Sequence, residues 1–235
     1  MKNYKGFTLA EVLITLAIIG VVAAMTIPVI MMEKDKEAWA AQLKKTYSAL
    51  ENARRLVIST DGEDMADLFS STDSTAGNAA LTAMAKHLSI AKNCGAGKGC
   101  WYDGMKFLNG TYYDSYDANN GSFETALNGF HGKAILADGT LIDVANWGSN
   151  CTLDQSSAYS PAHYKYYCGA ITIDVNGIKP PNTLGKDVYV FDVTREGFYP
   201  HGIQYSNDDI FGDCQMSQKG WGCAARVLKE GGINY

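Results

Sequence analysis

The pattern of apolar and polar positions divides the chain into an apolar segment, an amphipathic segment and a segment with strand-like patterns. Residues 7–32 are apolar almost throughout, and Glu11 is the one charged residue among them. An apolar run of this length can span a bilayer as a helix, which needs about 20 residues.

From residue 33 onward, large apolar residues recur three, four or seven positions apart with charged and polar residues between them: Trp39, Leu43, Tyr47, Leu50 and Val57. This spacing is typical of a helix with one buried face. We therefore expect one long helix over 7–58, whose second half, 33–58, packs along a domain.

The rest of the chain combines loops with strand patterns. Residues 59–78 are rich in Ser, Thr, Asp and Gly and predict a loop, and 79–91 predict a short helix. Apolar and β-branched runs separated by Asp-Gly and Asn-Gly turns predict strands at 133–137, 140–144, 170–175 and 186–193, with a short further strand at 198–203. A last helix is expected at 223–230, ended by two glycines. The fold class predicted is α+β, with the long helix packed on an antiparallel β-meander of about four strands.

Composition and charge indicate which class of macromolecule is expected as a partner. The chain has 235 residues, a formal net charge of −5 and no block of basic residues. A nucleic acid is therefore not expected as the main partner, since its phosphates require a basic surface. The 24 glycines and 14 tyrosines against 5 prolines favour a loop-rich domain that contains β-structure.

Six cysteines follow the apolar segment and fall into pairs that are close in sequence: Cys94 with Cys100, Cys151 with Cys168, and Cys214 with Cys223. An even number of cysteines behind a membrane-targeting segment favours disulfides formed in an oxidising compartment. Six cysteines allow many pairings, and we expect the local one. A zinc site is the alternative, but there is no C-x2-C pair and no histidine at ligand spacing.

The N-terminus allows several interpretations. Lys2 and Lys5 form a short basic leader that ends at Gly6. In a cleaved secretory signal, Val22-Ala23-Ala24 would be the cutting site, but apolar residues continue beyond it and Glu11 lies inside the apolar core. A simple uncleaved anchor is a second alternative. A buried core helix is disfavoured because the segment is apolar on all sides.

A fourth interpretation rests on a specific motif. Residues 5–14, KGFTLAEVLI, closely resemble the cleavage motif of type IV prepilins and type II secretion pseudopilins. The resemblance is dense over residues 5–30. In that family a prepilin peptidase cuts after the glycine on the cytoplasmic side of the membrane and methylates the new N-terminal residue.

The resemblance assigns roles to individual residues. The cut would fall between Gly6 and Phe7, and Phe7 would become the N-methylated terminus. Glu11 takes the place of the family's glutamate and would pair with the N-terminal amine of a neighbouring subunit, which offsets the cost of a buried carboxylate. Gly20 and Pro28 match the residues that loosen or kink the helix in many members.

The resemblance also implies an organisation. Residues 1–6 would be the leader, 7–32 the transmembrane and filament-core helix, 33–58 its amphipathic continuation, and 59–235 an extracytoplasmic globular domain. The chain would lie in the bacterial inner membrane as a single-pass protein, consistent with the leader lysines staying in the cytoplasm. Expected partners are other copies or related subunits, the prepilin peptidase, the membrane and an inner-membrane assembly platform.

One group of oxygen-bearing side chains is a candidate for calcium, which some pseudopilins bind in this half of the domain. Asp174, Asn176 and Asp187 have the ligand type that calcium requires. The twelve-residue calcium-loop pattern is missing, and Asn176-Gly177 by itself explains a hairpin turn. Both interpretations stay open, and no other cofactor is expected. Asp208, Asp209 and Asp213 form a comparable acidic cluster, which we expect to be a solvated loop.

The sequence predicts a structural protein. No G-x-S-x-G or H-E-x-x-H motif is present, and a Cys–His nucleophile would need a thiol that the expected disulfides occupy. The function expected is a structural subunit of a type IV pilus or type II secretion pseudopilus, and not an enzyme. The alternative is a membrane-tethered extracytoplasmic binding module, for example for glycans, that does not polymerise.

Overall fold

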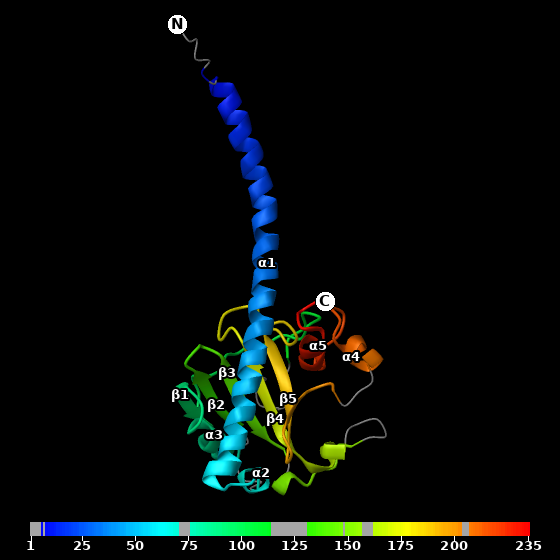
Figure 1. The fold of residues 1–235 in the computed structure, drawn as a ribbon. Helices are drawn as coiled ribbons and strands as arrows, with labels where there is room; N and C mark the ends of the chain where they lie inside the picture. The colour runs from blue at the N-terminus through cyan, green and yellow to red at the C-terminus, as the bar shows by residue number, and fades with distance from the viewer. Residues whose placement is uncertain are drawn as a thin grey trace. The chain divides into compact units, whose positions relative to one another are not determined.

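The computed structural model describes Gly6 and residues 8–70, 76–113, 131–147, 149–156, 162–203 and 207–235. Phe7, one of the two residues at the expected cleavage point, lies outside this description. The chain divides into two compact units, Met1–Ala38 and Trp39–Tyr235. Helix α1 begins in the first unit and ends in the second (Figure 1).

Helix α1 spans Leu9–Leu56 and continues into a π-helical turn, η1, over Val57–Asp61. The expected long helix is thus confirmed, with its end within a few residues of the predicted position. Gly62 stops it with a left-handed φ of 72°, and its N–H bonds to the carbonyl oxygen of Val57. Glycine suits this position because a side chain would strain the left-handed backbone.

The other helical elements are short. They are α2 (Met65–Leu68), α3 (Ala76–Ala85), η2 (Ser149–Cys151), η3 (Ala162–Tyr166), α4 (Asn207–Asp213) and α5 (Cys223–Glu230). Helix α5 has the predicted bounds and is closed by Gly231 in the left-handed region.

The sheet is a six-stranded antiparallel meander in which the order in space equals the order in sequence. Its strands are β1 (Ile90–Gly95), β2 (His131–Leu136), β3 (Leu141–Asn146), β4 (Tyr167–Asp174), β5 (Val188–Thr194) and β6 (Phe198–Pro200). The class α+β, with a long helix and an antiparallel meander as in pilin-like proteins, is confirmed. The four central strands lie close to the predicted ranges, and β1 and β6 are the edges.

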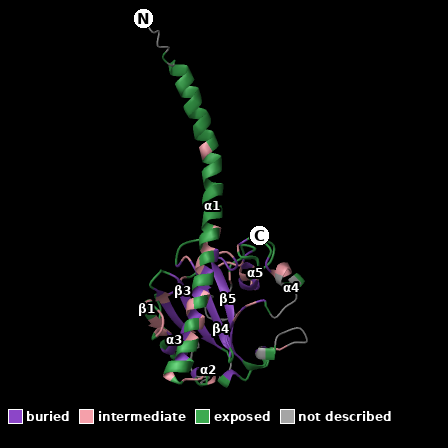
Figure 2. Ribbon diagram, in the orientation of Figure 1, coloured by how far each residue is buried: buried purple, intermediate pink, exposed green. Residues whose placement is uncertain are grey.

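The two faces of the sheet are both covered. On one face, side chains such as Ile171 and Phe191 join the buried residues of α1, for example Leu43 and Leu50, in the main core. Figure 2 shows this part of α1 meeting the buried strands. On the other face, alternate residues of β4 and β5 form a smaller cluster with Met105 and Leu184, namely Ala170, Val188 and Val190. This alternation follows from the two-residue period of a strand.

Three disulfides join the loops in the predicted local pairing. They are Cys94–Cys100, Cys151–Cys168 and Cys214–Cys223, and no cysteine is left free. The second one ties η2 to the start of β4. In the chain-entropy model a loop of this length stabilises the fold by about 3 kcal/mol.

Three expectations about secondary structure differ from the structure in detail. The sheet has six strands, where about four and one short further strand were expected, and β1 is the strand that was missed. The helix expected over 79–91 ends at Ala85, and part of the range is strand β1, because pairing with β2 decides its conformation. Asp208, Asp209 and Asp213, expected in a solvated loop, lie in α4, where the first two are acidic residues of the first turn. Acidic side chains are favourable there because they face the positive end of the helix dipole.

Candidate functional site

Helix α1 begins with a reciprocal cap between Thr8 and Glu11. The Oε2 atom of Glu11 accepts hydrogen bonds from the backbone N–H and the hydroxyl of Thr8, both at 2.8 Å. In return, the Oγ1 atom of Thr8 accepts from the backbone N–H of Glu11 at 3.2 Å. This is a capping box, which satisfies backbone donors that a helix start leaves without partners. Glu11 therefore has hydrogen-bond donors within its own chain, which reduces the cost of keeping a carboxylate in an apolar segment.

The apolar part of α1 exposes its side chains on all sides. Large apolar residues from Leu9 to Met32 are exposed, and Figure 2 shows this stretch in green. Within the described chain, α1 is the one helix that is long and apolar enough to cross a membrane. Gly20 and Pro28 both lie inside it, and the helix is continuous through them. The loosening of the helix at these two residues stays a prediction.

The second half of α1 is attached to the rest of the globular unit at two places. Most of the side chains that make these contacts are polar and lie outside the apolar stripe that the periodicity predicts. The first place is the turn between β2 and β3. There, Asp138 accepts hydrogen bonds from Gln42 and Lys45, each at 2.7 Å. Burial raises the pKa of Asp138, but the bonds from Lys45, Gln42 and Thr140 outweigh it and lower that pKa to about 2. The Asp138 carboxylate is therefore ionised at neutral pH, where it accepts both bonds.

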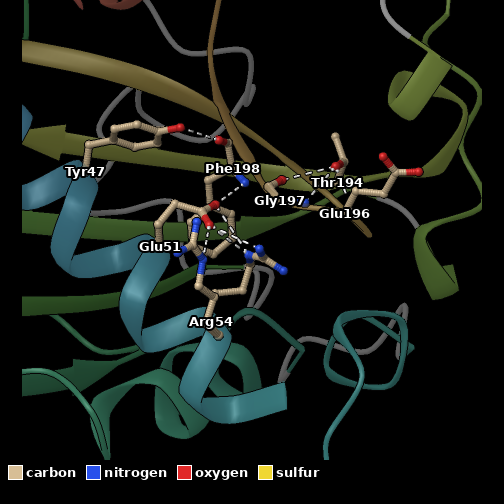
Figure 3. Close-up of polar contacts among 8 residues, drawn as sticks. Tyr47, Glu51, Arg54, Thr194, Glu196, Gly197 and Phe198 are labelled. Carbon is tan, nitrogen blue, oxygen red and sulfur yellow. Dashed lines mark hydrogen bonds and ion pairs between the residues drawn. The ribbon is translucent and has the colours of Figure 1, made fainter. Parts of the chain in front are cut away.

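The second place is edge strand β6, which Figure 3 shows in close-up. Glu51 accepts the backbone N–H of Phe198 at 2.6 Å, and the hydroxyl of Tyr47 donates to the carbonyl oxygen of Phe198 at 3.0 Å. Arg54 approaches the Glu51 carboxylate with two nitrogens at 3.1–3.3 Å. Side chains of α1 thus satisfy both backbone polar groups of Phe198, which closes this sheet edge against pairing with other strands.

The N-terminal sequence matches one family model. Residues 1–27 match the prokaryotic N-terminal methylation motif. The chain has a prepilin-type N-terminus. This motif is the signature of type IV pilin and pseudopilin precursors, and the resemblance found in residues 5–30 is thereby confirmed. No curated protein and no solved structure matches the chain.

The three calcium candidates meet at the connection between β4 and β5. Asp174 is the last residue of β4, and its two oxygens accept from the Tyr102 hydroxyl at 2.5 Å and the Asn176 N–H at 3.1 Å. Asp187 lies just before β5 and accepts the backbone N–H groups of Asn182 at 2.8 Å and Thr183 at 2.7 Å. Both carboxylates are fully buried.

Two negative charges on this buried pair of carboxylates, Asp174 and Asp187, are electrostatically unfavourable. Burial and the neighbouring Asp187 carboxylate raise the pKa of Asp174 to about 8, and burial raises the pKa of Asp187 to about 6. The side-chain oxygens of Asn176 and Asn182 are buried there without a hydrogen-bond partner. Oxygen atoms of this kind suit calcium. However, no group of three or more His, Cys, Asp or Glu side chains that could hold a metal is found among the described residues. Calcium binding stays a prediction.

A pH series tests the carboxylate pair. The folded pKa of Asp174 lies above its ordinary value of 3.8, so ionisation in the folded state is penalised and stability falls as pH rises from about 4 to about 8. We expect the unfolding temperature of the full chain in detergent to fall over this range, and Asp174→Asn to flatten the fall. If calcium binds here, it raises the unfolding temperature at pH 8 in the original chain more than in Asp174→Asn. Equal shifts would exclude this site.

Sequence reasoning missed the polar contacts of α1. Gln42, Lys45, Glu51 and Arg54 stand between the apolar positions of an amphipathic helix, where such residues usually face water. The available signal was their position next to the buried stripe, because side chains that flank it lie at the border of the interface.

Proposed function

We propose that this chain is a structural subunit of a type IV pilus or type II secretion pseudopilus. Prepilin peptidase would cut between Gly6 and Phe7 and methylate Phe7, and the mature chain would wait in the inner membrane before it enters a helical filament. The observation that supports this most directly is the methylation motif at residues 1–27. The globular domain would face the extracytoplasmic side, where disulfides form.

The surface of α1 suits a filament core as well as a lipid bilayer, and the methylation motif is what favours the filament. Its apolar half is exposed on every side, so copies of this helix bury a large area when they pack together in a filament core. Glu11 would then pair with the N-terminal amine of a neighbouring copy through its carboxylate. The capping box with Thr8 holds the carboxylate at the start of the helix, next to where such an amine would lie.

Mass spectrometry of the mature N-terminus tests the first step of this proposal. We expect a chain that begins at Phe7 and carries one methyl group on its amine, because the cleavage motif is complete. The control is the same chain from cells that lack the prepilin peptidase, which should keep Met1 and its leader. A mature chain that begins near Met25, or a leader that stays in cells with active peptidase, would contradict the proposal.

A further inference from the structure

The connections of the sheet gather at two opposite ends of the globular unit. Because neighbouring strands are antiparallel, the turn between β2 and β3 lies at the same end as the connection from β4 to β5. The turn between β5 and β6 and the start of β4 lie at the other end. We refer to these as the first end and the second end.

The first end is basic and has an exposed apolar tip. Its excess positive charge comes from Lys179 and Lys186 of the β4–β5 connection, because the charge of Lys45 at this end is balanced by its ion pair with Asp138 in the β2–β3 turn. Ile178 stands next to Lys179 and is 67% exposed, the highest value among the large apolar side chains described in this unit. A large aliphatic side chain exposed to this degree and flanked by lysines is suited to a hydrophobic contact within an acidic surface.

The second end is acidic and has exposed aromatic side chains. Trp147 is 58% exposed and Tyr166 is 46% exposed. The Cys151–Cys168 disulfide constrains the chain close to both residues. In addition, the backbone N–H of Trp147 bonds to the carbonyl oxygen of Cys168 at 3.1 Å. Acidic residues of α2, of the segment after η2 and of the β5–β6 turn surround this region: Asp64, Asp67, Asp154 and Glu196. With Glu51 at the start of β6, the acidic residues number five against four basic ones: Lys165, Arg195, which pairs with Asp64, and Arg54 and Arg55, which pair with Glu51.

We propose that the first end of one copy docks on the second end of another copy, with Ile178 against Trp147 and Tyr166. The lysines beside Ile178 then face the acidic residues around the aromatic pair. The opposite pairings, first end on first end or second on second, would bring like charges together, which costs binding energy. Since the two surfaces differ and lie at opposite ends, the contact is heterologous and repeats from copy to copy along the proposed filament. This inference rests on the proposed filament and names a contact between its globular domains.

Cysteine cross-linking in filament-producing cells tests the contact. All six native cysteines are in disulfides, so an introduced cysteine supplies the free thiol. The full chain carrying both Trp147→Cys and Ile178→Cys should give a ladder of disulfide-linked multimers under mild oxidation. Each single variant should remain monomeric. Adding Lys179→Glu and Lys186→Glu to the double variant should lower the cross-linked fraction several-fold, because the reversed charges would meet the acidic end.

The alternative outcomes are distinct. Filaments with methylated Phe7 that give no ladder would overturn this contact and leave the proposed function in place. Dimers formed by either single variant would indicate a symmetric contact and would also overturn it. A chain that is neither methylated nor found in filaments would overturn the proposed function itself. A control pair, Trp147→Cys with Met216→Cys, places the second thiol on an exposed side chain outside the proposed contact and should give no ladder.

Discussion

Replacing Glu51 with alanine is expected to lower the free energy of unfolding of the globular unit by about 3 kcal/mol, the scale for leaving a largely buried ion-pair partner and a backbone donor without their acceptor. Glu51 and Arg54 have side chains that are only 14% and 12% exposed. Without the carboxylate, the N–H of Phe198 loses its acceptor and the Arg54 guanidinium loses its counter-charge. Urea denaturation of the full chain in detergent, followed by near-ultraviolet circular dichroism, measures the change.

Two further variants separate the causes of this effect. Glu51→Gln keeps an oxygen that accepts the Phe198 N–H but loses the charge beside Arg54, so about half of the loss is expected. Glu37→Ala removes a carboxylate from the same helix, but its ion pair with Lys34 is about 70% exposed on both sides. Exposed pairs of this kind contribute less than about 1 kcal/mol. If Glu51→Ala and Glu37→Ala had equal effects, the contact with β6 would not stabilise the domain.

The contact at Glu51 shows where sequence reasoning ends for this protein. The helix itself was predictable, because its apolar and amphipathic halves have clear periods over many residues. The partner of Glu51 was not, because Phe198 is 147 positions away and binds through its backbone. Every residue except proline has a backbone N–H, so the residue type at this position gives no sign of the contact. Only the packing of α1 on the sheet brings the two together.

The strands also include some that the sequence predicted and one that it did not. β2 to β5 were predicted because buried apolar runs end at Asp-Gly and Asn-Gly turns. β1 was missed because it is an edge strand with exposed Ala91, Lys92 and Asn93 and two register shifts against β2. Its conformation comes from pairing and not from local preference. By contrast, Asp174 and Asp187 were predicted to lie close together, because they stand at the facing ends of two predicted strands and an Asn-Gly turn follows the first strand.

Replacing Glu11 with glutamine is expected to leave leader cleavage intact and to reduce filament formation about tenfold or more. The leader, Gly6 and Phe7 are unchanged, so processing should proceed. Glutamine also retains an oxygen that can accept the Thr8 N–H and hydroxyl, so the start of α1 should stay capped. What it lacks is the negative charge for the amine of the next copy. A loss of about 1.4 kcal/mol at each contact lowers the association constant about tenfold.

This variant therefore separates the two roles of Glu11, which alanine would remove together. Sheared filaments are quantified against total mature chain, and the fraction of methylated Phe7 is measured in the same cells. Glu33→Gln is the matched control, because Glu33 lies on the same helix, is 61% exposed and pairs only with Lys36 at 3.1 Å within the described contacts. Normal filament yield in Glu11→Gln but not in Glu11→Ala would show that the cap, and not the charge, is what assembly requires. Loss in both variants with full methylation assigns the carboxylate to the contact between copies.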